Sequence, residues 1–138
     1  MIRLEGVDVT FGVGTPLETL ALRGLDLDVA TGSFVSVIGS NGAGKSTVLN
    51  VIAGNVVPDR GRVLIAGEDV TSVAPHRRAR WISRVFQDPR RGTCEQLTVV
   101  ENMAIALGRT APRGFRAAVD RSMRAEVERR LTGLGLGL

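Results

Sequence analysis

Apolar and polar residues alternate along the first thirty positions of the chain. The apolar positions of the two alternating stretches are Ile2, Leu4, Val7 and Val9, then Leu20, Leu22, Leu27 and Val29. A period of two is typical of strands with one buried face. The pattern therefore predicts two antiparallel strands before residue 32.

Two other segments predict strands. Residues 33–38 are a short, mostly apolar run, which is typical of a covered strand in a parallel sheet. Residues 81–86 predict another strand. A turn at residues 58–61 leads into one more predicted strand at residues 62–66. A strand, glycine-rich turn and helix in succession favour an α/β fold.

Helical signals follow these segments. Residues 46–53 have a helical composition and end at Gly54 and Asn55. Thr98 and Glu101 form a capping box, which predicts a helix through about Leu107. Apolar residues then recur every four positions and predict one face of another helix. They are Phe115, Val119, Met123, Val127 and Leu131.

Composition narrows the class of protein. The chain has 138 residues, of which 43% are hydrophobic and 23% charged, so we expect one globular domain or part of one. No apolar run approaches the roughly 18 residues that span a bilayer, and we expect neither export nor a membrane span. Cys94 and His76 are the only cysteine and histidine, which disfavours a disulfide or a zinc site.

Charge is distributed unevenly. Residues 1–75 have a net charge of −3, whereas residues 76–138 have a net charge of +7. The arginines of the second half form either solvated helix faces or a surface for a partner. Aromatic residues are too sparse for a surface that stacks nucleic-acid bases, so no nucleic-acid partner is expected.

A glycine-rich stretch after residue 38 carries the most specific chemistry. Its glycines, lysine and hydroxyl residue have the spacing of a phosphate-binding P-loop. Backbone N–H groups of such a loop point inward at the positive end of a helix. The residues predicted to bind the nucleotide are Gly39, Ser40, Asn41, Gly42, Ala43, Gly44, Lys45, Ser46 and Thr47. The alternative is an ordinary glycine-rich turn between a strand and a helix.

Three side chains of this loop have separate predicted roles. Lys45 would reach the β- and γ-phosphates, Ser46 would hold Mg²⁺ through its hydroxyl, and Thr47 would support the α-phosphate. Lys45 is the only lysine among 18 basic residues. It occupies the position where a planar guanidinium would crowd the loop.

Stretches outside the loop resemble ABC-type ATPases. Residues 81–89 resemble the Q-loop of that family, and residues 58–65 and 97–102 follow its order and spacing. The resemblance covers the whole chain. It implies the N-terminal part of a P-loop ABC-type nucleotide-binding domain, with a β subdomain and P-loop core in residues 1–90 and the start of a helical subdomain in residues 91–138. Residues 80–116 are similar to the ATP-binding subunits of poorly characterised bacterial importers, some of them linked to aromatic amino acids.

The resemblance also implies roles for single residues. Gln87 would touch Mg²⁺ or the attacking water and couple the site to the helical subdomain, unless it is an exposed loop amide. Phe11 stands where the family places an aromatic ring that stacks on adenine, with simple strand packing as the alternative. Arg90 and Arg91 would lie near the coupling helix of a membrane partner, or they are solvated.

The family's later motifs do not occur. No LSGGQ-like signature, no apolar run ending in Asp-Glu and no switch histidine follow Gln87. The resemblance therefore implies binding of ATP and Mg²⁺ by the energising subunit of an ABC transporter, without hydrolysis by this chain alone. Its partners would be a transmembrane permease and a second nucleotide-binding subunit, at the cytoplasmic face of the membrane.

Three other classes of protein share some of these features. A stand-alone nucleotide-binding or regulatory protein remains the alternative. GTPases are disfavoured, because their Asn-Lys-x-Asp element needs a lysine other than Lys45. Chromosome-maintenance ATPases share these motifs but continue into coiled coils or zinc modules, neither of which begins here.

The first part of such a domain leaves the edges of its parallel sheet open. We therefore expect the 138-residue chain to fold weakly or to aggregate. Thermal unfolding followed by circular dichroism tests this expectation. A cooperative melt from a soluble monomer without nucleotide would contradict it.

Overall fold

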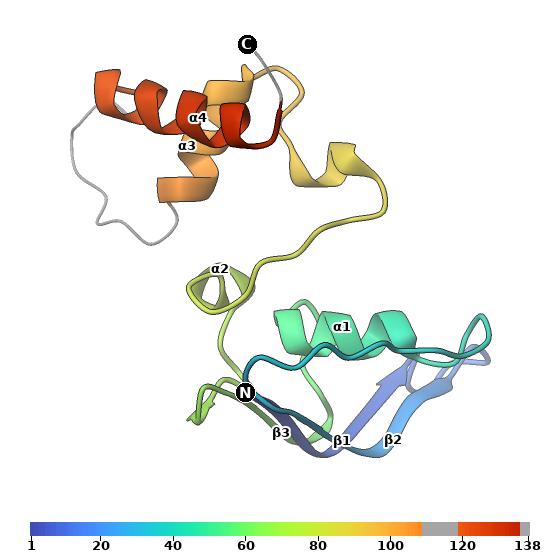
Figure 1. Cartoon of the computed structure of the whole chain (residues 1–138). Coiled ribbons are helices and arrows are strands. Elements are labelled where there is room, and N and C mark those ends of the chain that lie inside the picture. Colours follow the sequence, from blue (N-terminus) through green and yellow to red (C-terminus); the bar gives the residue numbers. More distant parts are fainter. Residues whose placement is uncertain (109–118, 136–138) are drawn as a thin grey trace. The chain divides into compact units, whose positions relative to one another are not determined.

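The structure is a computed structural model that describes residues 1–108 and 119–135. The chain divides into two compact units, Met1–Ile82 and Ser83–Leu138. The first unit contains a β-sheet with helices, and the second is helical (Figure 1). None of the helices in the described ranges has the length and apolar character needed to cross a bilayer.

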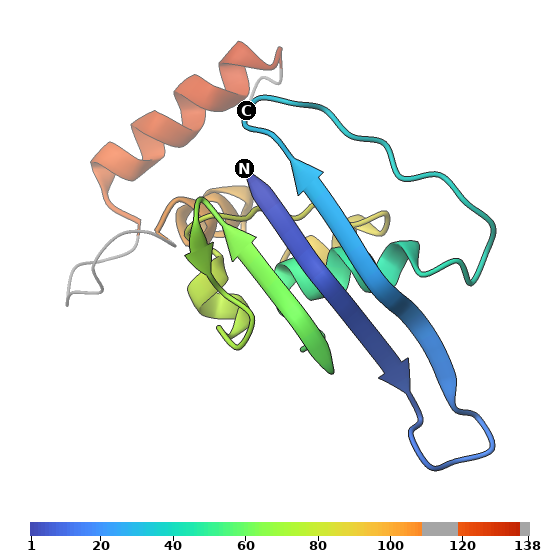
Figure 2. The same cartoon turned by 90° about the horizontal axis from the view of Figure 1, so that it is seen from below.

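The described residues of the first unit form one antiparallel sheet, with strand order β2-β1-β3-β4 (Figures 1 and 2). Its strands are β1 (Ile2–Phe11), β2 (Thr19–Val29), β3 (Arg60–Ile65) and β4 (Glu68–Asp69). The two predicted strands before residue 32 are thus confirmed as an antiparallel pair. The strand predicted at residues 62–66 is also confirmed, with β3 beginning two residues earlier.

Helix α1 (Lys45–Ala53) covers the apolar face of the sheet (Figure 2), as the composition of residues 46–53 predicts. Val48 and Val51 are its buried residues, and Val51 has no exposed surface. Burying an aliphatic side chain of this size contributes about 1.5–3 kcal/mol. The core that they join comprises Leu4, Val7, Val9, Leu22, Val48, Val51, Val63, Ile65 and Val70. A short helix, α2 (Pro75–Arg78), follows this core.

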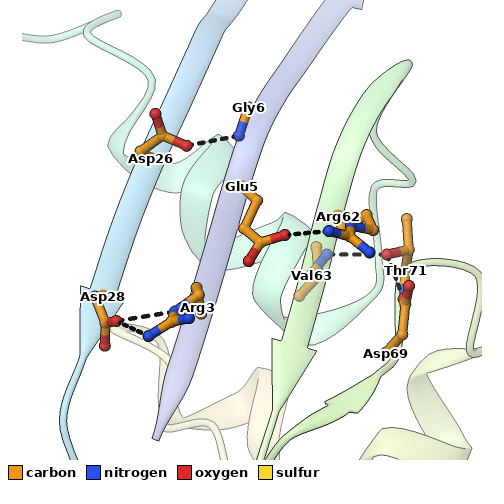
Figure 3. A network of polar contacts seen from close by, with 9 residues as sticks. All are labelled: Arg3, Glu5, Gly6, Asp26, Asp28, Arg62, Val63, Asp69 and Thr71. Atoms are coloured by element: carbon orange, nitrogen blue, oxygen red, sulfur yellow. Dashed lines mark hydrogen bonds and ion pairs between the residues drawn. The ribbon is translucent and has the colours of Figure 1, made fainter.

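The opposite face of the sheet is polar (Figure 3). Two exposed ion pairs join its strands: Arg3–Asp28 at 2.6 Å and Glu5–Arg62 at 2.8 Å. Asp26 on β2 accepts a hydrogen bond of 2.7 Å from the backbone N–H of Gly6, where the register of β1 shifts by a residue. Exposed ion pairs contribute little to stability, whereas the Asp26 carboxylate gives the Gly6 N–H a partner at the point where the register shifts.

The strands predicted at residues 33–38 and 81–86 do not form, so both predictions are wrong for this structure. Neither segment pairs with a described strand. Phe34 and Ile38 are 96% and 91% exposed, and Val85 is 95% exposed. A parallel strand needs neighbours for its N–H and C=O groups, and the described sheet, antiparallel throughout, has none to offer them.

The described residues of the second unit form η1 (Pro89–Gly92), α3 (Val99–Gly108) and α4 (Arg121–Gly133). Helices α3 and α4 pack together, and Val127 is fully buried, as the predicted apolar stripe requires. The Asp120 carboxylate accepts a hydrogen bond of 2.8 Å from the N–H of Met123 and begins α4. Val119 therefore precedes the helix, and Phe115 lies outside the described residues.

The predicted capping box begins α3. The Glu101 carboxylate accepts hydrogen bonds from the Thr98 hydroxyl at 2.7 Å and the Thr98 N–H at 2.8 Å. The Glu101 N–H donates to the Thr98 hydroxyl at 3.3 Å. The hydrogen bonds from Thr98, the hydroxyl first, lower the pKa of Glu101 below its ordinary value.

Because these bonds favour the charged carboxylate, the stability they give is fully present above the ordinary pKa of a glutamate. It is lost as the pH falls through the lowered pKa. Thr98→Ala should raise the pKa of Glu101 toward its ordinary value, as followed by NMR of the side-chain carboxyl carbon. Thr10→Ala in β1 is the control and should leave the titration unchanged. An identical titration in Thr98→Ala would contradict the capping box.

Candidate phosphate-binding site

The predicted P-loop residues run from residue 39 into the first turn of α1, which begins at Lys45. Residues 39–43 are exposed, Gly44 is buried, and Lys45 and Thr47 are half-buried beside an exposed Ser46. All nine predicted residues therefore lie together at the positive end of one helix.

Lys45 is tied to the beginning of its own loop. Its Nζ donates hydrogen bonds to the carbonyl oxygens of Gly39 at 2.7 Å and Ser40 at 2.6 Å. Because of these bonds, the backbone of residues 39–44 bends around the Lys45 side chain. An ammonium has three N–H donors, so the geometry holds the charge inside the loop and leaves it a donor for an anion.

Gly44 closes the loop against the sheet. Its φ is 83°, and within the described residues no side chain caps α1 at this position. The first N–H groups of a helix have no partner in the helix, so those of α1 suit phosphate oxygens. A Cβ on Gly44 would lie 2.7 Å from the Ala21 carbonyl oxygen and 3.0 Å from Leu22 Cδ2. The left-handed backbone and the contact with β2 both require glycine.

The charge pattern around the loop also favours an anion. Lys45 is the only charged residue between Asp28 and Asp59. No carboxylate of this stretch competes with a phosphate for the ammonium or for the helix N-terminus. The N–H groups, the lysine and the hydroxyls of Ser46 and Thr47 therefore fit a polyphosphate with its magnesium ion.

Phe11 is the last residue of β1, opposite Thr19 of β2. Its side chain is 44% exposed and does not belong to the buried core. The adjoining loop exposes Val13 and Leu17 as well. A ring in this position is accessible to a planar group such as a nucleobase.

Gln87 belongs to the second unit, whereas Phe11 and the P-loop belong to the first. Gln87 is exposed and immediately precedes Asp88, whose carboxylate accepts a hydrogen bond of 3.0 Å from the Arg90 N–H. That bond begins η1. Arg90 also pairs with Glu95 at 3.5 Å, with most of its side chain in solvent.

The arginines of the basic half differ in their surroundings. The guanidinium groups of Arg84 and Arg91 lie 4.8 Å and 5.3 Å from the centre of the Phe86 ring, within the range of a cation–π contact. Arg78, in contrast, is only 1% exposed. The interpretation of these arginines as a solvated face is wrong for Arg78, and no pattern in the sequence distinguishes it from its exposed neighbour Arg77.

Two alanine substitutions separate the contact of Gly44 from its backbone conformation. Gly42 has a φ of 85°, close to the 83° of Gly44, but a Cβ there meets nothing within 4 Å. Both substitutions strain the backbone, whereas Gly44→Ala must also displace the Ala21 carbonyl. We expect Gly44→Ala to lower the free energy of unfolding by about 2 kcal/mol more than Gly42→Ala does. Urea unfolding measures the difference, and equal losses would contradict the contact.

Comparisons with known proteins relate the chain to one family. The sequence profile of the ABC transporter family matches residues 22–138. The tyrosine transport ATP-binding protein of Clostridioides difficile (strain R20291) is 40% identical over 109 residues, which are 79% of this chain and 43% of that protein. The bicarbonate transport ATP-binding protein CmpC of Synechococcus elongatus is 36% identical in an alignment of 139 positions, which covers 99% of this chain and 19% of CmpC.

Solved structures show the same fold. The dimeric bacterial ABC transporter cassette MJ0796 superposes with a TM-score of 0.76 at 30% identity, and the match covers 98% of this chain and 56% of that cassette. The chain thus spans about half of a solved cassette and less than half of each of these two curated relatives.

Proposed function

This chain belongs to the ABC transporter family of ATP-binding domains, and from that premise we propose that it binds ATP with Mg²⁺ within the energising subunit of a transporter. One observation carries the proposal. The Lys45 ammonium is held by two loop carbonyls at the N-terminus of α1, which no side chain in the described part of the chain caps. That arrangement of a charge and backbone donors suits the phosphates of a nucleotide.

Each part of the nucleotide has a proposed contact in the chain. The backbone of residues 39–47 and the Lys45 ammonium would bind the phosphates, and Ser46 would hold Mg²⁺ together with Gln87. The exposed ring of Phe11 would stack on the adenine base. Mg²⁺ would neutralise phosphate charge, so that the site needs only one lysine.

The proposed partners follow from the family. We propose that the chain works beside a transmembrane permease and a second nucleotide-binding subunit at the inner face of the membrane. The dimeric state named for the MJ0796 cassette supports the second partner. Exposed Arg90 and Arg91, which follow Gln87, are the candidate contacts with the permease.

Hydrolysis is proposed to need more than these residues. No signature motif, no strand ending in Asp-Glu and no histidine follow Gln87 within the 138 residues. A carboxylate that positions the water and a residue that senses the γ-phosphate are both required for efficient cleavage. We therefore propose that this chain binds ATP but does not turn it over by itself.

Lys45→Ala tests the proposed site. Loss of a charge-assisted contact with the phosphates should raise the Kd for ATP by at least about tenfold, as measured by isothermal titration calorimetry. Arg60→Ala is the matched control, because it removes one exposed positive charge on β3, which β1 separates from the strand that Gly44 contacts. An unchanged Kd in Lys45→Ala would refute the proposal, and equal losses in both variants would reduce it to a general charge effect.

Ser46→Ala tests the proposed magnesium contact. The native chain should bind ATP more tightly with Mg²⁺ than with excess chelator, because the ion joins the phosphates to the hydroxyl. Ser46→Ala should remove most of that difference and leave magnesium-free binding nearly unchanged. Ser33→Ala, in the segment preceding the loop, should retain it. A full magnesium effect in Ser46→Ala would show that the hydroxyl is not a ligand.

A further inference from the structure

The buried guanidinium of Arg78 binds the end of the same helix that begins at the P-loop. Its Nη1 donates to the carbonyl oxygens of Val51 at 2.8 Å and Ile52 at 2.9 Å. Its Nε donates to Val73 O at 2.8 Å, and its Nη2 to Thr71 O at 3.0 Å. One side chain thus joins the last turn of α1 to the segment between β4 and α2.

A buried cation is costly unless its donors are satisfied, and all three nitrogens of Arg78 have acceptors. Val51 and Ile52 belong to the last turn of α1, whose carbonyls carry the negative end of its dipole. The Val51 carbonyl also accepts from the Gly54 N–H at 3.1 Å. Burial lowers the pKa of Arg78, and the charge of Asp69 acts in the opposite direction. A guanidinium stays protonated in proteins, so Arg78 binds the end of α1 as a cation.

The contact between Arg78 and α1 leaves no space. Gly54, the residue after α1, has a φ of 83°, and a Cβ on it would lie 2.7 Å from Nε of Arg78. Thr71, whose carbonyl accepts from Arg78, is fixed in turn to the sheet (Figure 3). Its hydroxyl accepts a hydrogen bond of 2.9 Å from the Val63 N–H and donates to the Asp69 carboxylate at 2.6 Å.

The main chain of Arg78 anchors a different segment. The N–H groups of Trp81 and Ile82 donate to the Arg78 carbonyl oxygen at 2.9 Å and 3.1 Å. Both side chains pack against the core. From Ile82 the chain continues to Gln87 five residues later. Through its side chain and its backbone, Arg78 therefore contacts the helix of the P-loop and the beginning of the segment that carries Gln87.

We propose that Arg78 is a positioning residue that holds α1 for nucleotide binding and transmits occupancy of the P-loop to the segment leading to Gln87. The inference rests on the proposed function, since it assigns a role within the same ATP site. The path is short: the two ends of α1 are about 14 Å apart, and both are held by direct hydrogen bonds. Besides the shared core, the hydrogen bonds of Arg78 thus give a direct route by which a shift of α1 at the phosphates reaches Trp81.

Trp81 is the only tryptophan of the chain, so its fluorescence reports on this path. In the native 138-residue protein, ATP with Mg²⁺ should change Trp81 emission with the same Kd that calorimetry gives. Arg78→Lys keeps a charge but lacks the planar fork that reaches four carbonyls. It should raise the Kd about tenfold and abolish the emission change at saturating ATP, at a temperature where circular dichroism shows the variant folded. The control Arg77→Ala, at an exposed neighbour, should behave as the native chain.

Chemical rescue separates positioning from general stability. Arg78→Ala leaves a buried space lined by the four carbonyls, and guanidinium ion added far below denaturing concentrations should restore both ATP affinity and the emission change. If Arg78→Ala does not fold, the ATP affinity and Trp81 emission of Arg78→Lys test the inference instead. Native affinity and a native emission change in folded Arg78→Lys would overturn the inference. So would the absence of an emission change when ATP binds the native protein.

The two proposals fail in different ways. If the native chain shows no calorimetric binding of ATP, the proposed function is wrong and the role of Arg78 falls with it. If the native chain binds ATP and Lys45→Ala does not, while Arg78→Lys equals the native chain, only the inference about Arg78 is wrong.

Discussion

Burial of Val48 and Val51 against the sheet is the interaction on which the site depends. These two side chains fix the rotation of α1 about its own axis, because they are the apolar face that the core accepts. Once the rotation is fixed, Gly44 must lie against β2 at one end and the last carbonyls must face Arg78 at the other. A nine-residue helix is too short to be stable alone, so the packing of this face supplies the stability that the loop requires.

The features that could be predicted from the sequence are those with local causes. The alternation in β1 and β2 follows from one buried face, the capping box of α3 from two side chains three residues apart, and the position of α1 from its glycine boundaries. The candidate site belongs to this group. Its spacing between Gly39 and Thr47 is itself the physical requirement, so the structure brings those residues together as their order implies.

Features with distant causes could not be predicted. Residues 33–38 have the composition of a covered strand, but a strand exists only if another strand pairs with it, and that partner is not encoded in the segment. Phe34 and Ile38 remain exposed for this reason. The burial of Arg78 could not be predicted for another reason, because it depends on carbonyls up to 27 residues away along the chain. Composition gives the same expectation for it as for Arg77, and only the tertiary structure separates them.

The isolation of Lys45 gives the chain an unusual chemical selectivity. Reagents that acylate side-chain amines have one target here, and a lysine-specific protease has one cleavage site, at the first residue of α1. The hydrogen bonds from Nζ to the carbonyls of Gly39 and Ser40 occupy two of the donors of that amine. Acylation of Lys45 would remove the positive charge that binds the carbonyls of Gly39 and Ser40. Modification of this one nitrogen would therefore both label the candidate phosphate-binding loop and remove its charge.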